Sequence, residues 1–273
     1  VKAKSELYEY VSEHGGIIFI NEKDPVLKKS LKGIRSKYQV KERGPSIVTY
    51  GERNLISTKN RNPDLIGEYN LINMNAAKAV ALELRVPAKQ IDDAIATYKP
   101  ANMRSQHIVS KKTGNRILLD AYNANPSSMP AAIDAFLENA TAKGDGTKKP
   151  AKGAAANGIP YTIPFMILGD MRELGKETET EHEKLIKFAE KKAKAAGARI
   201  VFIGEELTKA MMQQSKSNKA EKDPAAALSF FFKTKEDFLK SETLKNMQDK
   251  TKPAYIFVKG SRGMKLEDLV ESL

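Results

Sequence analysis

Three polar clusters in the sequence, each at the end of an apolar run, hold the residues best suited to bind a ligand. They read DAYNANP at 120–126, GDMRELG at 169–175 and KGSRG at 259–263. Lys259 and Arg262 suit an anion, because arginine binds oxyanions as a bidentate fork and lysine acts as a point charge. Taken alone, each cluster is better explained as a turn or a helix cap. Three of them at equivalent places favour a ligand site with carboxylate, amide and cationic groups.

The elements that must position these clusters alternate between strand and helix. After Lys99-Pro100 we expect strands at 115–119, 162–168, 199–203, 228–232 and 254–258, and helices at 129–139, 179–196, near 208, at 235–247 and from 266. This alternation predicts an α/β fold with a mostly parallel, doubly wound, Rossmann-like sheet. Because ligands bind such sheets beyond the carboxyl ends of the strands, the three clusters should meet at one edge.

The residues before this boundary form a smaller set of elements. Apolar periodicity and proline placement predict helices at 5–11, from Asp24-Pro25, at 70–84 and at 87–98, with strands at 17–21 and 47–50. A chain of 273 residues with 41% hydrophobic content favours two domains, which we place at 1–99 and 100–273. The Ala-, Gly- and Lys-rich segment 141–162 has no apolar periodicity and predicts a flexible loop.

Several chemistries are disfavoured by what the sequence lacks. It has no cysteine and three histidines, which argues against a metal site and favours a structural role for His182. It contains neither Gly-x-Ser-x-Gly nor the phosphate-binding loop GxxxxGK[ST]. The net charge of +12 comes from dispersed lysines, which argues against a nucleic-acid partner. Because the apolar runs are too short to cross a bilayer, we expect a soluble protein without membrane insertion.

Seven motifs in order along the chain resemble those of the Mur ligases, and within them the D-alanyl-D-alanine-adding branch. They are AKSELY at 3, INEKDP at 20, GEYNLINMNAA at 67, PANMRSQ at 100, LLDAYNANPSSM at 118, ILGDMRELGKE at 167 and VKGSRGMKLE at 258. Members of this family resemble three-domain proteins. The resemblance implies that residues 1–99 are the C-terminal part of the central ATP-binding domain and that 100–273 are the Rossmann-like domain for the incoming amino component.

The resemblance also implies an activity in peptidoglycan precursor synthesis, located in the cytoplasm. Such an enzyme uses ATP and Mg²⁺ to form an acyl phosphate on UDP-N-acetylmuramoyl-tripeptide, and the amine of D-alanyl-D-alanine then attacks it. Because the sequence lacks the N-terminal domain, the phosphate-binding loop and the upstream magnesium ligands of the family, we expect this chain alone to be inactive. We expect a monomer. The third residue of the tripeptide would be recognised largely by parts of the enzyme outside this chain.

Three roles near the nucleotide follow from the resemblance. Lys4 matches a lysine that is carbamylated in the family, where the resulting anion supports a magnesium ion. Asn70 and Asn73 would face the adenine, whereas Arg104 and Asp120 would reach phosphate and ribose when the domains close.

The remaining matched residues would lie beside the nucleotide or the acceptor. Tyr122 matches a position next to the nucleotide, and Asn123 one next to the acceptor. The residues expected to line the dipeptide pocket are Asn125, Lys259, Ser261 and Arg262. The sequence departs from many relatives at Tyr69, where they carry histidine, and in the long segment 141–162.

Two other functions fit less well. A non-catalytic binding module that keeps the acceptor-domain surface is the main alternative, and a phosphate-binding loop encoded upstream would argue against it. A folate-polyglutamate-type ligase of the same superfamily is disfavoured, because YNANP and KGSRGM match the D-alanyl-D-alanine branch better.

Overall fold

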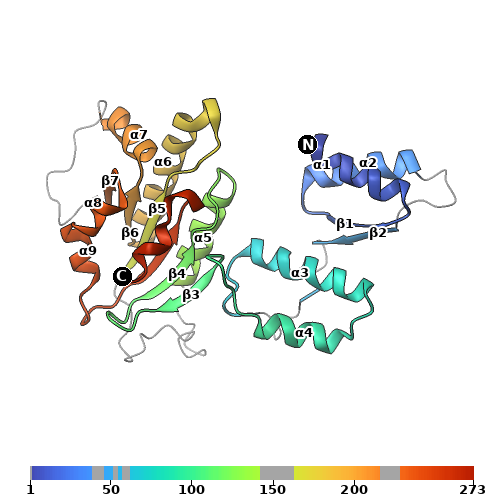
Figure 1. Cartoon of the computed structure of the whole chain (residues 1–273), viewed down its shortest axis with the longest axis horizontal. Helices are drawn as coiled ribbons and strands as arrows, with labels where there is room; N and C mark the ends of the chain where they lie inside the picture. The colour runs from blue at the N-terminus through green and yellow to red at the C-terminus, as the bar shows by residue number, and fades with distance from the viewer. Residues whose placement is uncertain (1, 39–45, 52–54, 57–61, 142–162, 216–227) are drawn as a thin grey trace. The chain divides into compact units, whose positions relative to one another are not determined.

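The computed structural model of the chain describes residues 2–38, 46–51, 55–56, 62–141, 163–215 and 228–273 (Figure 1). They belong to two compact units, residues 1–98 and 99–273. Most of the predicted loop 141–162 lies outside the described residues. Within the described ranges, no helix is long and apolar enough to span a membrane.

The unit 1–98 is built on two short parallel strands. Its elements are α1 (Lys2–Glu13), β1 (Ile17–Asn21), α2 (Pro25–Tyr38), β2 (Ser46–Tyr50), α3 (Glu68–Glu83) and α4 (Ala88–Thr97). The strands pair in register from Ile17 opposite Ser46 to Asn21 opposite Tyr50. The buried Ile18 and Ile20 of β1 pack with apolar side chains of α1 and α2, so this unit has a small core of its own.

The unit 99–273 is an α/β domain around a six-stranded sheet in the order β3-β4-β8-β5-β6-β7. Only the β3–β4 pair is antiparallel. The strands are β3 (Gln106–Val109), β4 (Arg116–Asp120), β5 (Pro164–Gly169), β6 (Arg199–Ile203), β7 (Ser229–Phe232) and β8 (Tyr255–Lys259). The helices are α5 (Ser128–Thr141), α6 (Thr178–Ala196), α7 (Glu205–Ser215), α8 (Lys235–Leu239) and α9 (Glu242–Met247), with short 3-10 turns η2 (Gly175–Glu177), η3 (Arg262–Met264) and η4 (Leu266–Leu269). The mostly parallel α/β sheet expected from the sequence is confirmed.

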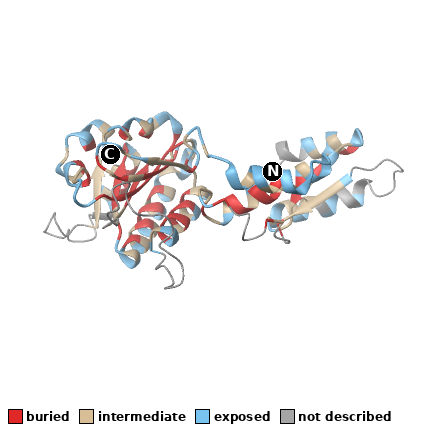
Figure 2. Cartoon of the chain, turned by 90° about the horizontal axis from the view of Figure 1, so that it is seen from below, coloured by how far each residue is buried: buried red, intermediate tan, exposed pale blue. Residues whose placement is uncertain are grey.

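Both faces of this sheet are covered, as parallel sheets require. On one face, Ile117, Ile167 and Val258 belong to a core cluster with α8, α9 and the C-terminal turns. On the other, Phe257 of β8 stacks on Phe136 of α5 with ring centroids 5.2 Å apart. Figure 2 shows the buried residues concentrated in the strands and on the inner sides of these helices.

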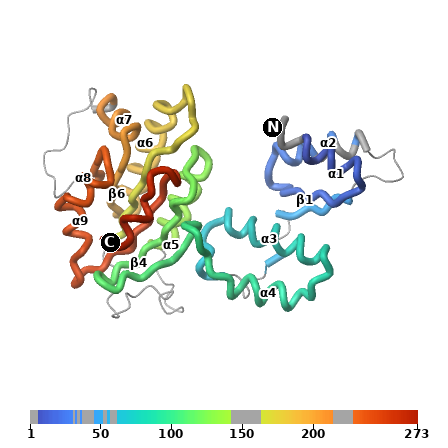
Figure 3. Tube along the Cα trace, in the orientation of Figure 1, coloured from blue at the N-terminus to red at the C-terminus, as the bar shows by residue number. Residues whose placement is uncertain are grey.

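The last strand of the chain lies in the middle of the sheet. β8 pairs with β4 on one side and with β5 on the other. In Figure 3, the red C-terminal part of the tube runs beside the green segment labelled β4. Its final residue, Lys259, is opposite Asp120 of β4 and Leu168 of β5. The register therefore places the three polar clusters level with one another at one edge.

The structure differs from the sequence expectation in three elements. The antiparallel edge strand β3 was not expected, because its four residues carry no long apolar run. The single helix expected at 235–247 is two helices, since Ser241 adopts an extended backbone and its hydroxyl caps Leu244 N. The helix expected from Leu266 is the short 3-10 turn η4.

Candidate functional site

A buried ion pair joins the clusters that follow β4 and β8. Lys259 Nζ lies 2.7 Å from Asp120 Oδ2 and donates to the carbonyl of Asn123 at 2.8 Å. The side chains of Lys259 and Asp120 are only 4% and 16% exposed. Asp120 Oδ1 also accepts a hydrogen bond from Ser105 N at 3.2 Å. The structure thus brings two predicted site residues together, but the ammonium is directed at the protein interior.

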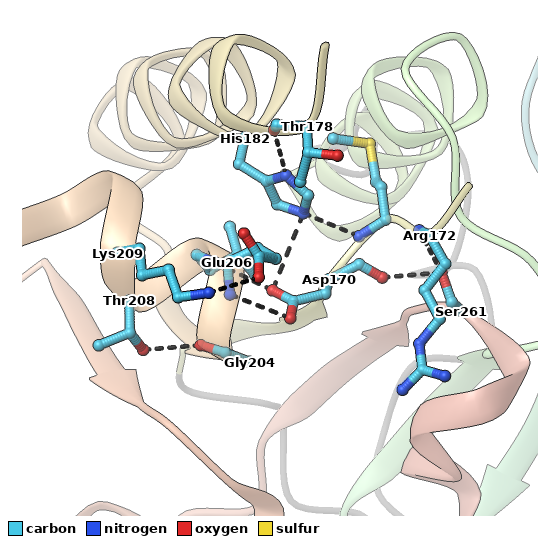
Figure 4. A network of polar contacts seen from close by, with 11 residues as sticks. Asp170, Arg172, Thr178, His182, Gly204, Glu206, Thr208, Lys209 and Ser261 are labelled. Atoms are coloured by element: carbon cyan, nitrogen blue, oxygen red, sulfur yellow. Dashed lines mark hydrogen bonds and ion pairs between the residues drawn. The ribbon is translucent and has the colours of Figure 1, made fainter. Parts of the chain in front are cut away.

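Ser261 ties the cluster after β8 to the cluster after β5. Its side chain is buried, its Oγ donates to the carbonyl of Asp170 at 2.8 Å, and it accepts from Arg172 N at 3.1 Å (Figure 4). This hydroxyl therefore both donates and accepts a hydrogen bond within the protein. Lys259 and Ser261, two residues apart, fix the loops on either side of β8.

The fully buried His182 holds the same loop from the helix side, as Figure 4 shows. Its Nε2 accepts from Met171 N at 3.0 Å, and Nδ1 lies 2.6 Å from the carbonyl of Thr178. A nitrogen that accepts a backbone N–H carries no proton, so Nδ1 is the donor to Thr178, and Asp170 Oδ1 lies 3.8 Å from Nε2. These contacts agree with the structural role expected for His182.

Asp170 was not singled out from the sequence, although it follows directly on the end of β5. Its carboxylate accepts from Leu207 N at 3.0 Å and from Glu206 N at 3.2 Å, which caps the first turn of α7. Burial raises the pKa of Asp170, and these two N–H groups oppose the rise. The adjacent Gly204 has φ +147°, and a Cβ there would collide with the carboxylate.

Two arginine side chains contact the ring of Tyr122 at the same edge of the sheet. The guanidinium carbon of Arg104 lies 3.7 Å from the centroid of the Tyr122 ring, and that of Arg262 lies 5.2 Å from it. Both distances are typical of cation–π contacts. Hydrogen bonding and positive charge from Arg104, followed by those of Arg262, lower the pKa of the phenol of Tyr122, a half-buried residue. The structure thus places these three predicted residues in one cluster.

A cavity of about 230 Å³ opens beside these loops. Arg172 contributes to its wall and lies close to Gly263, where an added Cβ would come within 2.6 Å of Arg172 Nη1. The other charged residues of the lining are Asp170, Glu205, Lys233, Lys235 and Glu236. Because both positively and negatively charged side chains line the cavity, it suits a small zwitterion. Arg172 and this cavity were missed in the sequence analysis, although Arg172 is part of the GDMRELG motif.

Comparison with known proteins gives the same family as the motifs. No protein-family model matches the chain. The UDP-N-acetylmuramoyl-tripeptide--D-alanyl-D-alanine ligase of Bacillus subtilis (strain 168) is 26% identical over 292 aligned residues, which cover 100% of this chain and 54% of the relative. The enzyme of that name from Escherichia coli (strain K12) is 25% identical, with coverage of 100% and 55%. The chain is thus similar over its whole length to MurF-type Mur ligases.

Solved structures show the same fold. A crystal structure of MurF from Acinetobacter baumannii matches 99% of this MurF-like chain with a TM-score of 0.67 and 23% identity, covering 55% of that protein. MurF from Thermotoga maritima, solved in complex with ADP, matches 94% of the chain with a TM-score of 0.59 and 17% identity. The MurF-like chain spans about half the length of the curated relatives it matches over its whole length.

The other motif residues of the MurF-like chain are placed as follows. Asn123 is exposed. The side-chain oxygen of Asn125 accepts from the backbone N–H groups of Ser127 and Ser128 at 3.1 and 2.8 Å. Asn125 therefore has the capping role that the sequence also suggested for this cluster. Its predicted contact with the dipeptide stays a prediction.

The predicted nucleotide residues of the first unit lie on α1 and α3. Lys4 is part of α1, and its side chain lies outside the described residues. Asn70 is buried and donates to the carbonyl of Ile66 at 2.8 Å, whereas Asn73 is exposed on the same helix. In the part of the chain that the structure describes, no three His, Cys, Asp or Glu side chains cluster closely enough to hold a metal ion.

Proposed function

We propose that residues 99–273 are the acceptor domain of a MurF-type ligase and that residues 1–98 are the last part of its ATP-binding domain. The complete enzyme would join D-alanyl-D-alanine to UDP-N-acetylmuramoyl-tripeptide through an acyl phosphate, with ATP and Mg²⁺ as cofactors. The observation that carries this proposal is the assembly of the clusters after β4, β5 and β8, in which Lys259 contacts Asp120 and Ser261 contacts Asp170 and Arg172.

Each cluster has a distinct task in this proposal. Arg104 and Asp120 serve the phosphate and ribose, and Asn70, Asn73 and Tyr122 serve the nucleotide. A carbamylated Lys4 would support magnesium. Such roles use fixed charges around a transferred phosphoryl group and a positioned amine, which is how phosphoryl-transfer enzymes lower their barriers.

The acceptor site in this proposal combines the expected residues with the cavity beside Arg172. In this proposal Asn123, Asn125 and Arg262 contact the dipeptide from the loops after β4 and β8, while Lys259 and Ser261 fix those loops. A dipeptide zwitterion has a carboxylate that matches the guanidinium of Arg172 and an amine that matches Asp170 or Glu205, both of which line the cavity.

Titration of the isotopically labelled 273-residue chain with D-alanyl-D-alanine, followed by NMR, tests the acceptor site. We expect stereospecific shifts at Arg172, Ser261 and Arg262, with L-alanyl-L-alanine as the matched control and Arg172→Gln weakening the D,D response. Equal shifts with both dipeptides, or none with either, would contradict the assignment. In the same samples we expect no ADP formation from ATP, because the sequence has no GxxxxGK[ST] loop.

A further inference from the structure

The loop after β5 is held at three consecutive residues by groups from two other elements. Ser261, after β8, donates to the carbonyl of Asp170 at 2.8 Å and accepts from Arg172 N at 3.1 Å. Between these contacts, Met171 N donates to Nε2 of His182 on α6 at 3.0 Å, as Figure 4 shows. One lone pair on an imidazole therefore connects α6 to the backbone that carries Arg172.

The imidazole offers this lone pair only while Nε2 carries no proton. Nδ1 lies 2.6 Å from the carbonyl of Thr178, and the ring is fully buried. A proton on Nε2 would remove the acceptor and leave the N–H of the buried Met171 without a partner, which is costly inside a protein. Asp170 Oδ1 lies 3.8 Å from Nε2 and would attract that proton. The ring of His182 thus has two alternative partners, the N–H of Met171 and the carboxylate of Asp170.

The backbone next to Arg172 is strained, and there is space beside its side chain. Glu173 has φ 64°, a region that non-glycine residues rarely adopt and that persists only where the surroundings enforce it. The exposed Arg172 borders two cavities, of about 230 and 630 Å³. The larger one is also lined by Glu173 and Glu206, whose charge attracts a guanidinium. Loss of the contact at Met171 would therefore let the loop relax and Arg172 turn toward the larger cavity.

We propose that His182 is a positioning residue that fixes Arg172 at the smaller cavity through the N–H of Met171, and that a proton on Nε2 releases this hold. The role of Arg172 toward a dipeptide carboxylate rests on the proposed function, whereas the hold on the loop does not. If both are right, the acceptor site takes its ligand less well once Nε2 is protonated.

Asp170 is the charged group that faces the ring from the loop after β5, and burial raises its pKa. On α7, the carboxylate of Glu206 is paired with Lys209 at 2.8 Å. On α5, Asp134 is paired with Lys192 of α6 at 2.7 Å. The charged side chains closest to the ring in sequence, on η2 and α6, are Lys176, Glu177, Glu179, Glu181, Glu183 and Lys184, and none of them is buried. Asp170 is therefore the titrating neighbour that an experiment must separate from the ring.

Two substitutions separate the hold on Met171 from the other contact of the ring. The amide of glutamine extends to the position of Nε2, whereas that of asparagine ends at the position of Nδ1. His182→Gln can therefore still accept from Met171 N, and His182→Asn can bond only the carbonyl of Thr178. In the ¹⁵N-labelled full chain, we expect the Met171 amide to exchange with solvent about tenfold faster in His182→Asn than in His182→Gln. The Nε–H signal of Arg172 should stay near its wild-type position only in His182→Gln.

Amides in the middle of β6, at Val201 and Phe202, are the control for general stability. Both residues are fully buried, so their exchange reports larger openings of the sheet. The tenfold difference between the two variants should be absent there.

The proton is tested on the wild-type chain between about pH 8 and pH 5, the range in which an ordinary imidazole titrates. The ring ¹⁵N signals of His182 show which nitrogen carries a proton, and the Met171 amide is followed in the same samples. We expect Nδ1 alone to be protonated at the upper end. The Met171 and Arg172 signals should then shift with the same midpoint as the protonation of Nε2. Because His182→Gln keeps Asp170 but has no ring, this step should vanish in that variant.

Three results would overturn the proposal. They are equal Met171 exchange in the two variants, a ring that gains no second proton down to about pH 5, and ring protonation that leaves the Met171 amide unmoved. Since no dipeptide is present, a failure of the ligase assignment leaves a positive result intact. D-alanyl-D-alanine added afterwards should bind more weakly to His182→Asn than to His182→Gln. If the wild type does not bind it either, the proposed acceptor site fails while the hold on Arg172 stands.

Discussion

The buried pair of Lys259 and Asp120 predicts a large and specific loss of stability when only one partner is removed. Lys259→Met keeps the length and apolar stem of the side chain but leaves Asp120, which is 16% exposed, without its counter-charge. Breaking a buried pair in this way costs about 3–5 kcal/mol. Asp120 keeps its bond from Ser105 N and some contact with water, so we expect the lower end, about 3 kcal/mol.

The double variant is the matched control for this prediction. In Lys259→Met with Asp120→Asn, no unpaired charge remains, and the pair of substitutions should recover most of the loss, because replacing both members of a buried pair is often close to neutral. Measuring the Asp120→Asn single variant as well completes a double-mutant cycle, which gives the coupling energy between the two side chains.

Native-state hydrogen exchange of the β4 and β8 amides is the suitable assay, since the chain has two compact units and a single unfolding transition cannot be assumed. A loss of about 3 kcal/mol corresponds to exchange that is roughly 150-fold faster at these amides. A cost below about 1 kcal/mol for Lys259→Met, or a double variant as unstable as the single one, would refute the reasoning.

Two further predictions concern Asp170, in the loop after β5, and its close approach to Gly204, which follows β6. Gly204→Ala should cost about 2–3 kcal/mol in native-state hydrogen exchange of the β5 and β6 amides, because φ is +147° and the new Cβ would meet the Asp170 carboxylate. The control Gly175→Ala, with φ +56° and open space, should cost about 1 kcal/mol, and equal costs would contradict the role of the contact. The pKa of Asp170 is raised in the folded state from 3.8, so the folded protein binds more protons than the unfolded chain above that pH, and stability falls as pH rises through this window. Asp170→Asn lacks this titration, so its stability relative to the wild type should increase from about pH 3 to pH 7, and a constant difference would disprove it.

The sequence predicted that the three polar clusters share one edge of the sheet, but it did not predict the contacts that each side chain makes there. Alternating strands and helices were enough to place three polar clusters at one edge, because parallel strands have only one carboxyl edge. The burial of Lys259 could not be predicted, since its partner Asp120 is 139 residues away and the pairing depends on β8 lying beside β4. A lysine after a strand gives the same local pattern whether its ammonium faces solvent or a buried carboxylate.

Local signals explain two of the other differences. Ser241 carries the sequence pattern of a helix cap, and its effect was hidden only by the continuous helical propensity on both sides. Asn125 supports both a cap and a ligand contact by residue type, and the hydrogen bonds from Ser127 N and Ser128 N show that its side-chain oxygen serves the cap. The edge strand β3 depends on pairing with β4, which a four-residue segment does not reveal by itself.

The position of β8 makes the site depend on the very end of the chain. Lys259 reaches back 139 residues to Asp120, and Ser261 reaches back 91 residues to Asp170. Contacts of such long sequence separation form late, because the entropy of closing the loop must be overcome first. In the sheet, β8 separates β4 from β5, so the loops after these two strands are joined only through contacts made by the end of β8. We therefore expect a truncation before β8 to disorder the loop that carries Tyr122 and the loop that carries Arg172 together.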